Sequence, residues 1–309
     1  MPRPPPPKPS HTPETGRSRL IAIGLMCGAV LCFSLLDVSA KWLTQSVDPL
    51  QIVFARYAVS MVLVLLLLNP VSHPGVLRTK RPWTQALRSL LLLGSTALNF
   101  FALKYLQLAE TVSIMFATPL VVALVSGPLL GEWPGPRRLA AIGVGFLGVL
   151  VITRPGLGAM HPAALLVLMS CLCYAFYSLA TRVLAAFDPP ETTMVYSGVA
   201  GTLALAPLMP LVWITPSAPE SWLLMLATGA FGGFGHWLLI LAHRLAPATV
   251  LAPFIYSQIV WMIALGFLVF GQLPDRWTFA GAAIVIASGL YLLYRERVRA
   301  VPAGSARLD

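Results

Sequence analysis

Long apolar segments, separated by short polar or turn-forming stretches, recur along almost the whole chain. A helix needs roughly 20 apolar residues to cross a bilayer core of about 30 Å. Most of the breaks carry proline, glycine or aspartate, as at Asp48-Pro49 and Asp188-Pro189, and these residues end helices. The pattern predicts ten membrane-spanning helices, at residues 20–43, 50–68, 84–106, 109–130, 138–153, 162–184, 192–214, 221–243, 247–270 and 277–294.

The composition is that of a chain whose main solvent is lipid. Of the 309 residues, 57% are hydrophobic and only 10% are charged, whereas soluble domains carry about a quarter charged residues. The predicted fold class is therefore an all-α integral membrane protein. The net charge of +10 does not indicate nucleic-acid binding, because the basic residues lie mostly in tails and in short loops.

The distribution of basic residues predicts the orientation in the membrane. With an even number of helices both termini share one side, and the opposite loops hold only Lys104, Arg154 and Arg276. The positive-inside rule then predicts a multi-pass protein of the cell inner (plasma) membrane with both termini cytoplasmic. The basic residues on the predicted cytoplasmic side are Arg3, Lys8, Arg17, Arg19, Arg78, Lys80, Arg81, Arg137, Arg138, Arg244, Arg295, Arg297, Arg299 and Arg307.

Both ends of the chain are predicted to lie outside the helices. Residues 1–19 contain a run of prolines and scattered basic residues, which predicts a disordered Pro-rich cytoplasmic tail. Residues 295–309 are predicted to form a basic cytoplasmic tail. The four cysteines lie inside apolar segments, where we interpret them as small packing residues. The sequence predicts no metal site and no cofactor.

An internal repeat relates the two halves of the chain at an offset of about 140 residues. Cys32–Leu43 aligns with Cys173–Leu184, and Gly131–Pro134 aligns with Gly271–Pro274. The predicted units are a first five-helix repeat over residues 20–155 and a second over residues 162–294. Because each unit has an odd number of helices, the second must cross the membrane in the opposite orientation, an arrangement typical of transporters with inverted repeats.

These segments resemble the drug/metabolite transporter superfamily, EamA type. The resemblance covers about residues 20–295 and implies a transporter of small metabolites that is not an enzyme. It rests on the five-plus-five repeat together with Ala102–Leu120, Gly131-Glu132 and Ala242–Pro274. Two further segments, Phe33–Leu43 and Gln51–Tyr57, are similar to the branch that includes S-adenosylmethionine uptake carriers.

Three charged residues within the predicted helices are candidate substrate-binding residues, because a charge in the membrane interior needs a partner or a cavity. Asp37 and Lys41 lie one helical turn apart and can form an i,i+4 ion pair, with either a structural role or a role in gating or substrate contact. Arg56 lies nearly two turns into its helix. Its side chain is expected either to line a cavity, with Asp37 as its carboxylate partner, or to extend to the interface.

Several uncharged residues complete the predicted substrate site, and most lie near the middle of their helices, where such folds bind substrate. Hydrogen bonding between helices is the alternative role for the polar ones. Thr118-Pro119 also predicts a bend beside the cavity. Asp37, Glu110 and His236 are the candidate groups for proton coupling. The uncharged site residues are Phe33, Asn99, Thr118, Tyr174, Ser178, His236, Tyr256 and Gln258.

The leading functional hypothesis is a secondary transporter that moves a small organic metabolite by alternating access. The candidate cavity offers basic, aromatic and amide groups but few acids, which favours an amino-acid-like substrate, zwitterionic or partly anionic. The alternative is an S-adenosylmethionine or nucleotide-type uptake carrier. A membrane enzyme is less favoured, because no catalytic motif is found, and a non-transporting scaffold is less favoured, because it would not require an inverted duplication. The expected partners are a small-molecule substrate and the bilayer, not nucleic acid, and a homodimer is left open.

Overall fold

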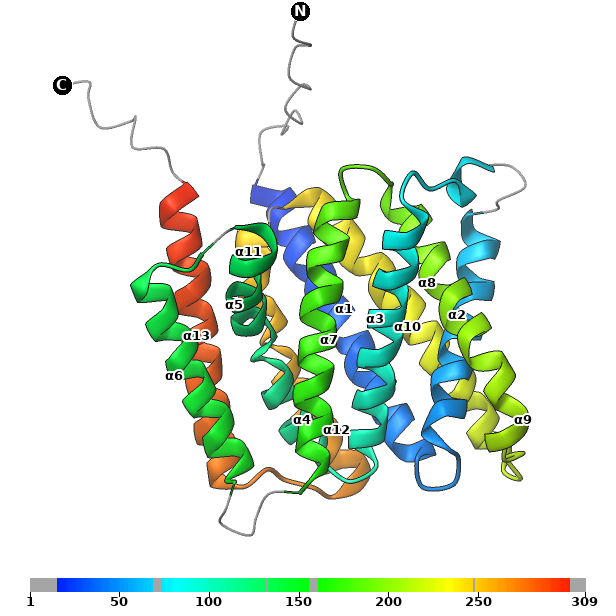
Figure 1. Cartoon of the computed structure of the whole chain (residues 1–309). Coiled ribbons are helices and arrows are strands. Elements are labelled where there is room, and N and C mark those ends of the chain that lie inside the picture. Colours follow the sequence, from blue (N-terminus) through cyan, green and yellow to red (C-terminus); the bar gives the residue numbers. More distant parts are fainter. Residues whose placement is uncertain (1–15, 69–73, 132, 156–160, 247, 301–309) are drawn as a thin grey trace, which may run out of the picture.

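The described part of the protein is an all-helical bundle whose helices run across the expected membrane (Figure 1). The structure is a computed structural model, and it describes residues 16–68, 74–131, 133–155, 161–246 and 248–300. The ten predicted spans are confirmed, because this part of the chain contains ten segments long and apolar enough to cross a membrane. The fold class predicted from the sequence is therefore correct.

The first repeat contains six helices and the second contains seven, because some spans are divided. A single turn, η1 (Pro74–Leu77), precedes α3, and another, η2 (Ala206–Leu208), precedes α9. The helices of the first repeat are α1 (Gly16–Leu43), α2 (Pro49–Leu68), α3 (Pro82–Leu103), α4 (Leu108–Met115), α5 (Thr118–Leu130) and α6 (Pro136–Thr153). Those of the second are α7 (Ala163–Leu184), α8 (Pro190–Leu205), α9 (Met209–Val212), α10 (Pro219–Leu245), α11 (Ala248–Ile255), α12 (Gln258–Phe270) and α13 (Arg276–Ala300).

The outermost helices reach further than the sequence predicted. Residues 16–19, predicted as part of the tail, belong to α1, and residues 295–300 belong to α13. The remaining parts of the two predicted tails, 1–15 and 301–309, lie outside the described residues. The start of α1 and the end of α13 lie at the same end of the bundle, at the top of Figure 1. We call this end the tail face and the opposite end the far face.

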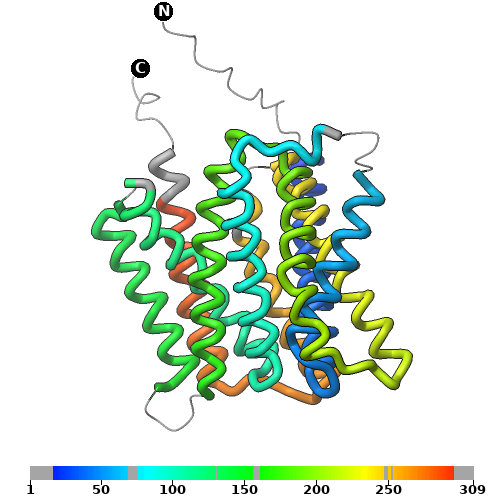
Figure 2. Tube along the Cα trace, turned by 45° about the vertical axis from the view of Figure 1, so that its right-hand side comes forward, coloured from blue at the N-terminus to red at the C-terminus, as the bar shows by residue number. Residues whose placement is uncertain are grey.

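The two repeats are inverted with respect to each other. α1 runs from the tail face to the far face, whereas its repeat counterpart α7 starts at the far face and runs back (Figure 1). The packing follows the same symmetry. In the repeats α1 corresponds to α7 and α3 corresponds to α10, and the structure packs α1 along α10 and α3 along α7. Figure 2 shows α6 and α13 side by side at the edge of the bundle, where they pair across the two repeats.

The fourth span of each repeat is divided into two helices. The predicted bend at Thr118-Pro119 is confirmed, because α4 ends at Met115 and α5 begins at Thr118. A corresponding break between α11 and α12 contains Tyr256 and was not predicted. Pro119 has no N–H to continue the first helix, and the bond from the Ser257 N–H to the Phe254 carbonyl tightens the second.

The two breaks meet in the middle of the bundle. The rings of Phe116 and Tyr256, which occupy corresponding positions in the repeats, contact edge to face with their centroids 4.9 Å apart.

The divided spans of the two repeats also end in the same way. Gly131 and Gly271 close α5 and α12 with φ angles of 72° and 65°, a left-handed conformation that glycine adopts without strain. The symmetry of the sequence repeat is thus reproduced in detail in the backbone.

Lys41 stabilises the end of α3 and does not pair with Asp37. Its Nζ donates to the carbonyls of Leu103 and Leu106 at 2.9 and 2.6 Å, and the side chain is buried. The described residues contain no ion pair between Asp37 and Lys41, so the predicted pairing is wrong. The reason is that the last carbonyls of a helix lack donors within the helix, and an ammonium group can satisfy two of them.

Replacing this lysine should destabilise the protein. Lys41→Met is expected to lower the free energy of unfolding by about 2 kcal/mol, because two carbonyls lose a charged donor in a buried setting. Unfolding of the purified protein in detergent measures the change. Lys104→Met is the matched control, since Lys104 is exposed at the same end of α3, and a change of less than about 0.5 kcal/mol is expected there. Equal effects of the two substitutions would contradict this role.

Candidate functional site

One face of α3 carries the polar contacts that define the interior of the bundle. Arg88, Leu92, Thr96, Asn99 and Leu103 recur every three or four residues, so they lie along a single side of the helix. Two polar pockets open along this side, each formed by helices of both repeats. α3 therefore places the groups of both pockets in register.

The first pocket, which we call the arginine pocket, lies between α2, α3, α7, α8 and α10 and encloses about 490 Å³ of empty space, part of it open to the surroundings. Its lining combines two arginines with hydroxyl groups, a histidine and glycines, and it contains no acidic residue. The lining residues are Arg56, Tyr57, Ser60, Val64, Arg88, Leu92, Tyr177, Met194, Ser197, Gly198, Gly232, Gly233 and His236.

Arg88 is held in place by a set of neutral acceptors from the second repeat. Its Nε donates to Thr181 Oγ1 at 2.9 Å, and its Nη2 donates to the Tyr177 hydroxyl at 2.9 Å. Nη1 donates both to the Thr193 carbonyl at 3.1 Å and to Ser197 Oγ at 2.5 Å. The guanidinium is consequently fixed by α7 and α8, although it belongs to α3.

Arg56 enters the same pocket with fewer contacts. Its Nη1 donates to Thr96 Oγ1 at 2.8 Å, and the guanidinium lies 4.9 Å from the centroid of the Tyr57 ring. Its Nε is buried without a hydrogen-bond partner. The side chain therefore points into the bundle and does not extend to the interface, which decides between the two positions considered from the sequence.

The second pocket, the aspartate pocket, lies between α1, α3, α4 and α12 and contains about 380 Å³ of empty space, part of it open to the surroundings. Asp37 accepts a long hydrogen bond of 3.5 Å from Asn99 Nδ2. Asp37 and Arg56 make no direct ion pair in the described part of the chain, but their charges interact, so the predicted partnership acts at longer range than contact. The lining residues are Asp37, Asn99, Leu103, Leu108, Thr111, Val112, Met115, Gln258 and Met262.

The structure distributes the eleven predicted site residues over the two pockets and their surroundings. Arg56 and His236 line the arginine pocket, and Asp37, Asn99 and Gln258 line the aspartate pocket. Phe33 contacts the His236 ring edge to face at 5.1 Å, and Tyr174 lies 5.1 Å from the Tyr177 ring. The remaining four residues also lie outside both linings: Lys41, Ser178, Thr118 and Tyr256. The Thr118 hydroxyl donates to the Met115 carbonyl at 2.6 Å.

The sequence analysis missed Arg88. The residue lies within the predicted span 84–106, and a charge inside an apolar segment was the available signal. Its position near the start of the span resembles that of an anchoring residue at the membrane surface. Only the packing of α7 and α8 against α3 shows that its side chain is buried, with 4% of its surface exposed.

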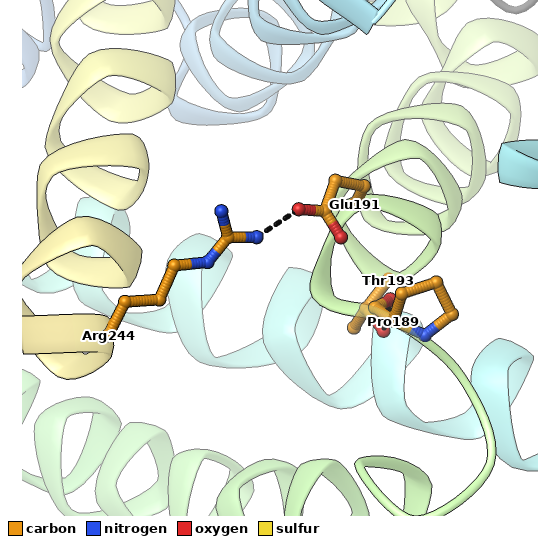
Figure 3. Close-up of polar contacts among 4 residues, drawn as sticks. All are labelled: Pro189, Glu191, Thr193 and Arg244. Carbon is orange, nitrogen blue, oxygen red and sulfur yellow. Dashed lines mark hydrogen bonds and ion pairs between the residues drawn. The ribbon is translucent and has the colours of Figure 1, made fainter. Parts of the chain in front are cut away.

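An ion pair joins two helices where the arginine pocket approaches the tail face. Figure 3 shows Arg244, in the last turn of α10, extended towards Glu191 in the first turn of α8, and the two side chains form a salt bridge. Glu191 lies one helical turn from the pocket residue Met194. Both side chains are partly exposed, so the pair contributes little to stability, but it joins two helices that form opposite walls of the pocket.

Asp188 connects the two repeats at the same face. It accepts hydrogen bonds from the Thr79 hydroxyl, from Gln85 Nε2 at 2.9 Å and from the backbone N–H of Lys80 at 3.1 Å. Burial by itself raises the pKa of the Asp188 carboxyl, but these hydrogen bonds and the charge of Lys80 outweigh it and hold the pKa below its ordinary value. The aspartate is therefore ionised at neutral pH and fixes the segment before α3.

This contact should make stability depend on pH in acid. Because the folded-state pKa of Asp188 lies below the unfolded value of about 3.9, its stabilisation is complete above about pH 4 and is lost as the pH falls through the folded pKa. Asp188→Asn is expected to cost about 1–3 kcal/mol at pH 7, and less at pH 3. Unfolding in detergent at both pH values measures the difference.

The matched control for this prediction is Asp48, the aspartate that precedes the second helix of the first repeat. The Asp48 carboxylate accepts a hydrogen bond from the Leu50 N–H at 2.8 Å, and an asparagine oxygen can accept it equally well. Asp48→Asn should therefore change stability by less than about 0.5 kcal/mol. A cost of Asp188→Asn that is the same at pH 7 and pH 3 would contradict the role of the ionised carboxylate.

Among the described residues, no group of three or more histidine, cysteine, aspartate or glutamate side chains is placed to hold a metal ion. The groups that the two pockets present are instead guanidinium, carboxylate, amide, hydroxyl and imidazole. Such groups bind a small polar molecule by charge and hydrogen bonding.

Comparison with known proteins identifies relatives over most of the chain. A family model described as the EamA-like transporter family matches twice, at residues 20–154 and 161–295. An S-adenosylmethionine uptake transporter of Rickettsia prowazekii is 26% identical over 85% of this chain and 89% of its own. A riboflavin transporter of Vibrio cholerae is 27% identical over 88% of this chain and 92% of its own.

A solved crystal structure shares the fold. It aligns with a TM-score of 0.63 at 20% sequence identity and covers 90% of this chain and 98% of its own. At this identity the likeness concerns the arrangement of the helices alone. Together with the two family matches, it agrees with a ten-helix bundle made of two repeats.

Proposed function

Because this chain belongs to the EamA-like transporter family, we propose that it moves an amino-acid-like metabolite, zwitterionic or partly anionic, across the inner membrane by alternating access. The chain is a multi-pass membrane transporter of a small molecule, as its family and relatives are. The observation that carries the finer proposal is the pair of polar pockets along one face of α3, one basic and one acidic, between inverted repeats.

The two pockets present opposite charges at neighbouring levels of the bundle. Arg56 is bonded to Thr96 and Asp37 to Asn99, and these two α3 residues lie three positions apart. Three residues of helix rise about 4.5 Å, a spacing that suits the separated charges of an amino acid. In this proposal Arg56 binds the acidic group of the substrate, Asp37 binds the amino group, and Asn99 and Gln258 orient it.

The inverted repeats support alternating access. Each repeat contributes helices to both pockets, and each contains one divided span, with the two breaks in contact through Phe116 and Tyr256. Two halves of similar structure and opposite orientation can exchange conformations, so that inward-open and outward-open states have similar energies. The tail face would lie in the cytoplasm under the positive-inside rule.

An S-adenosylmethionine uptake carrier is the second candidate. A specific observation favours it, since relatives from several Rickettsia species carry that name. S-adenosylmethionine has the amino and carboxylate groups that the first candidate requires, and it adds a positively charged sulfonium group that a carboxylate such as Asp37 can stabilise.

Flux into proteoliposomes tests these assignments. Purified protein is reconstituted, and uptake of labelled amino acids, S-adenosylmethionine, riboflavin and nucleotides is compared with that of empty liposomes. Saturable uptake of a compound that carries both an amino and a carboxylate group is expected, and it should be strongly reduced in Asp37→Asn. No uptake of any such compound, or uptake that is unchanged in Asp37→Asn, would contradict the proposal.

A further inference from the structure

We propose that Arg88 and Arg56 together form a two-arginine anion site, in which the acidic group of the substrate, a carboxylate or a phosphate, is bound between the two guanidinium groups. This inference rests on the proposed transport function and narrows its substrate class. It adds Arg88, a residue of the first repeat held in place by the second, to the binding site.

Both arginines carry a positive charge that is buried in the bundle. Arg88 and Arg56 have only 4% and 9% of their surface exposed, both lie within membrane spans, and the hydrogen bonds of both go to neutral groups. The lining of the arginine pocket contains no carboxylate, and no direct ion pair to either arginine occurs among the residues that the structure describes. The charge of Asp37, in the neighbouring pocket, acts on Arg56, but one carboxylate does not balance two buried guanidinium groups. A buried excess of charge is costly, so a bound anion would supply the missing countercharge.

The second argument is hydrogen-bonding capacity. A guanidinium has five N–H donors in a planar fork. Arg88 uses four of these for its neutral acceptors, which orient the group and leave one Nη2 donor. Arg56 uses one, to Thr96, and its buried Nε has no partner. Arg88 is thus a positioned charge, whereas Arg56 keeps a fork of donors for the two oxygens of a carboxylate or phosphate.

The third argument comes from the repeat. At the offset of 141 residues that aligns the second helices of the two repeats, Arg56 corresponds to Ser197, the residue that accepts a hydrogen bond from Arg88. At the same offset Arg88 corresponds to Gly229, on α10. Each of the two arginines of the first repeat thus has a small residue at the corresponding position of the second repeat. One of these small residues, Ser197, lines the same pocket as both arginines.

The small residues of α10 leave room for the ligand. A methyl group added at Gly232 would lie 3.4 Å from Arg56 Nε and 3.1 Å from Leu36 Cδ1. Gly232 and Gly233 both line the pocket. The aromatic rings of Tyr57 and Tyr177, whose centroids lie 4.9 and 4.6 Å from the two guanidinium carbons, stack beside the arginines. The rings fix the guanidinium planes and leave the unpartnered donors of Arg56 and the one remaining Nη2 donor of Arg88 for an anion.

Thermal unfolding of the reconstituted full-length protein tests the site with defined anions. Succinate and inorganic phosphate are the two probes, and succinamide and added chloride at equal ionic strength are the controls for shape and for salt. At least one of the two anions is expected to raise the melting temperature in a saturable manner, whereas succinamide and chloride are not. The anion that does so identifies the acidic group as a carboxylate or a phosphate.

Substitutions then assign the effect to Arg88. Arg88→Gln is expected to weaken the apparent affinity for the effective anion at least about tenfold, equivalent to about 1.4 kcal/mol. Arg88→Lys keeps the charge but loses the fork, so it should retain weaker binding, and it serves as the second variant if Arg88→Gln does not fold. Arg276→Gln is the matched control, because Arg276 is exposed at the far face, and its affinity should equal that of the wild type.

Three outcomes would overturn the site: no stabilisation by either anion, equal stabilisation by succinamide, or anion affinity that survives both Arg88→Gln and Arg88→Lys unchanged. The proteoliposome assay separates this failure from a failure of the transport proposal. Uptake of an amino-acid-like compound with equal rates in wild type and Arg88→Gln would refute the two-arginine site alone. Anion binding that depends on Arg88, without uptake of any compound, would refute transport of such a metabolite alone.

Discussion

Arg56→Gln is expected to lower the initial rate of substrate uptake at subsaturating concentration about 10- to 100-fold. A charge-assisted hydrogen bond contributes about 1.5–3 kcal/mol, and each 1.4 kcal/mol corresponds to a factor of ten. The Arg56 guanidinium is buried, touches Thr96 and Tyr57, and keeps an unpartnered Nε in the arginine pocket. Glutamine can reach the same region but carries no charge. Uptake of the effective compound into proteoliposomes measures the loss.

The controls for this prediction separate binding from folding. Arg276→Gln removes an exposed arginine with the same change of side chain, and its uptake should match that of the wild type. The unfolding temperature of Arg56→Gln should stay close to that of the wild type, because the relief of burying a charge offsets the loss of the bond to Thr96 and of the interaction with Asp37. If Arg56→Gln takes up the substrate at the same rate as the wild type, the acidic group of the substrate binds elsewhere.

Gly148→Leu is expected to destabilise the protein by about 3 kcal/mol or more. A first side-chain carbon at Gly148 on α6 would lie 2.8 Å from Val285 Cγ2 and 2.9 Å from the Gly281 carbonyl oxygen on α13. The carbonyl belongs to helix backbone and cannot turn aside, so the two helices must separate. Overpacking of this kind costs about 1–3 kcal/mol for a few methylenes, and here it also disrupts the interface between the two repeats.

The same helix provides the control for this substitution. Gly143 is exposed on α6, and a first side-chain carbon added there would meet nothing within 4 Å. Gly143→Leu should therefore change the free energy of unfolding by less than about 0.5 kcal/mol. Unfolding of both variants in detergent distinguishes the packing role of Gly148 from a general loss of helix flexibility. Equal effects of the two substitutions would refute close α6–α13 packing.

Part of the candidate site was readable in the sequence because the membrane makes polar residues conspicuous. Asp37, Arg56, Asn99, His236 and Gln258 stand out in apolar segments, and the structure places all five in the linings of the two pockets. Burial of a polar group in lipid requires a partner or a cavity. For these residues, the polar side chain and its approximate depth in the membrane were enough to predict a place in a pocket.

The remaining assignments depended on contacts between distant segments. Lys41 shares a helix face with Asp37, yet its Nζ binds Leu103 and Leu106, some 60 residues away in the chain. Periodicity along one helix indicates which residues can meet, but not whether another helix offers better acceptors. The predicted Asp37–Lys41 ion pair was wrong for this reason, whereas Asp37 and Arg56 interact through their charges without a direct ion pair.

The sequence by itself determined the spans, the repeat and hence the inverted arrangement of the halves, because apolar length and period are local properties that the bilayer enforces on every helix. Only the tertiary structure decided which polar groups share a pocket. Arg88 lies near the start of its span, and its burial results from α7 and α8 packing against α3. Such packing depends on the fit of side chains from separate repeats, which no single segment of the chain encodes.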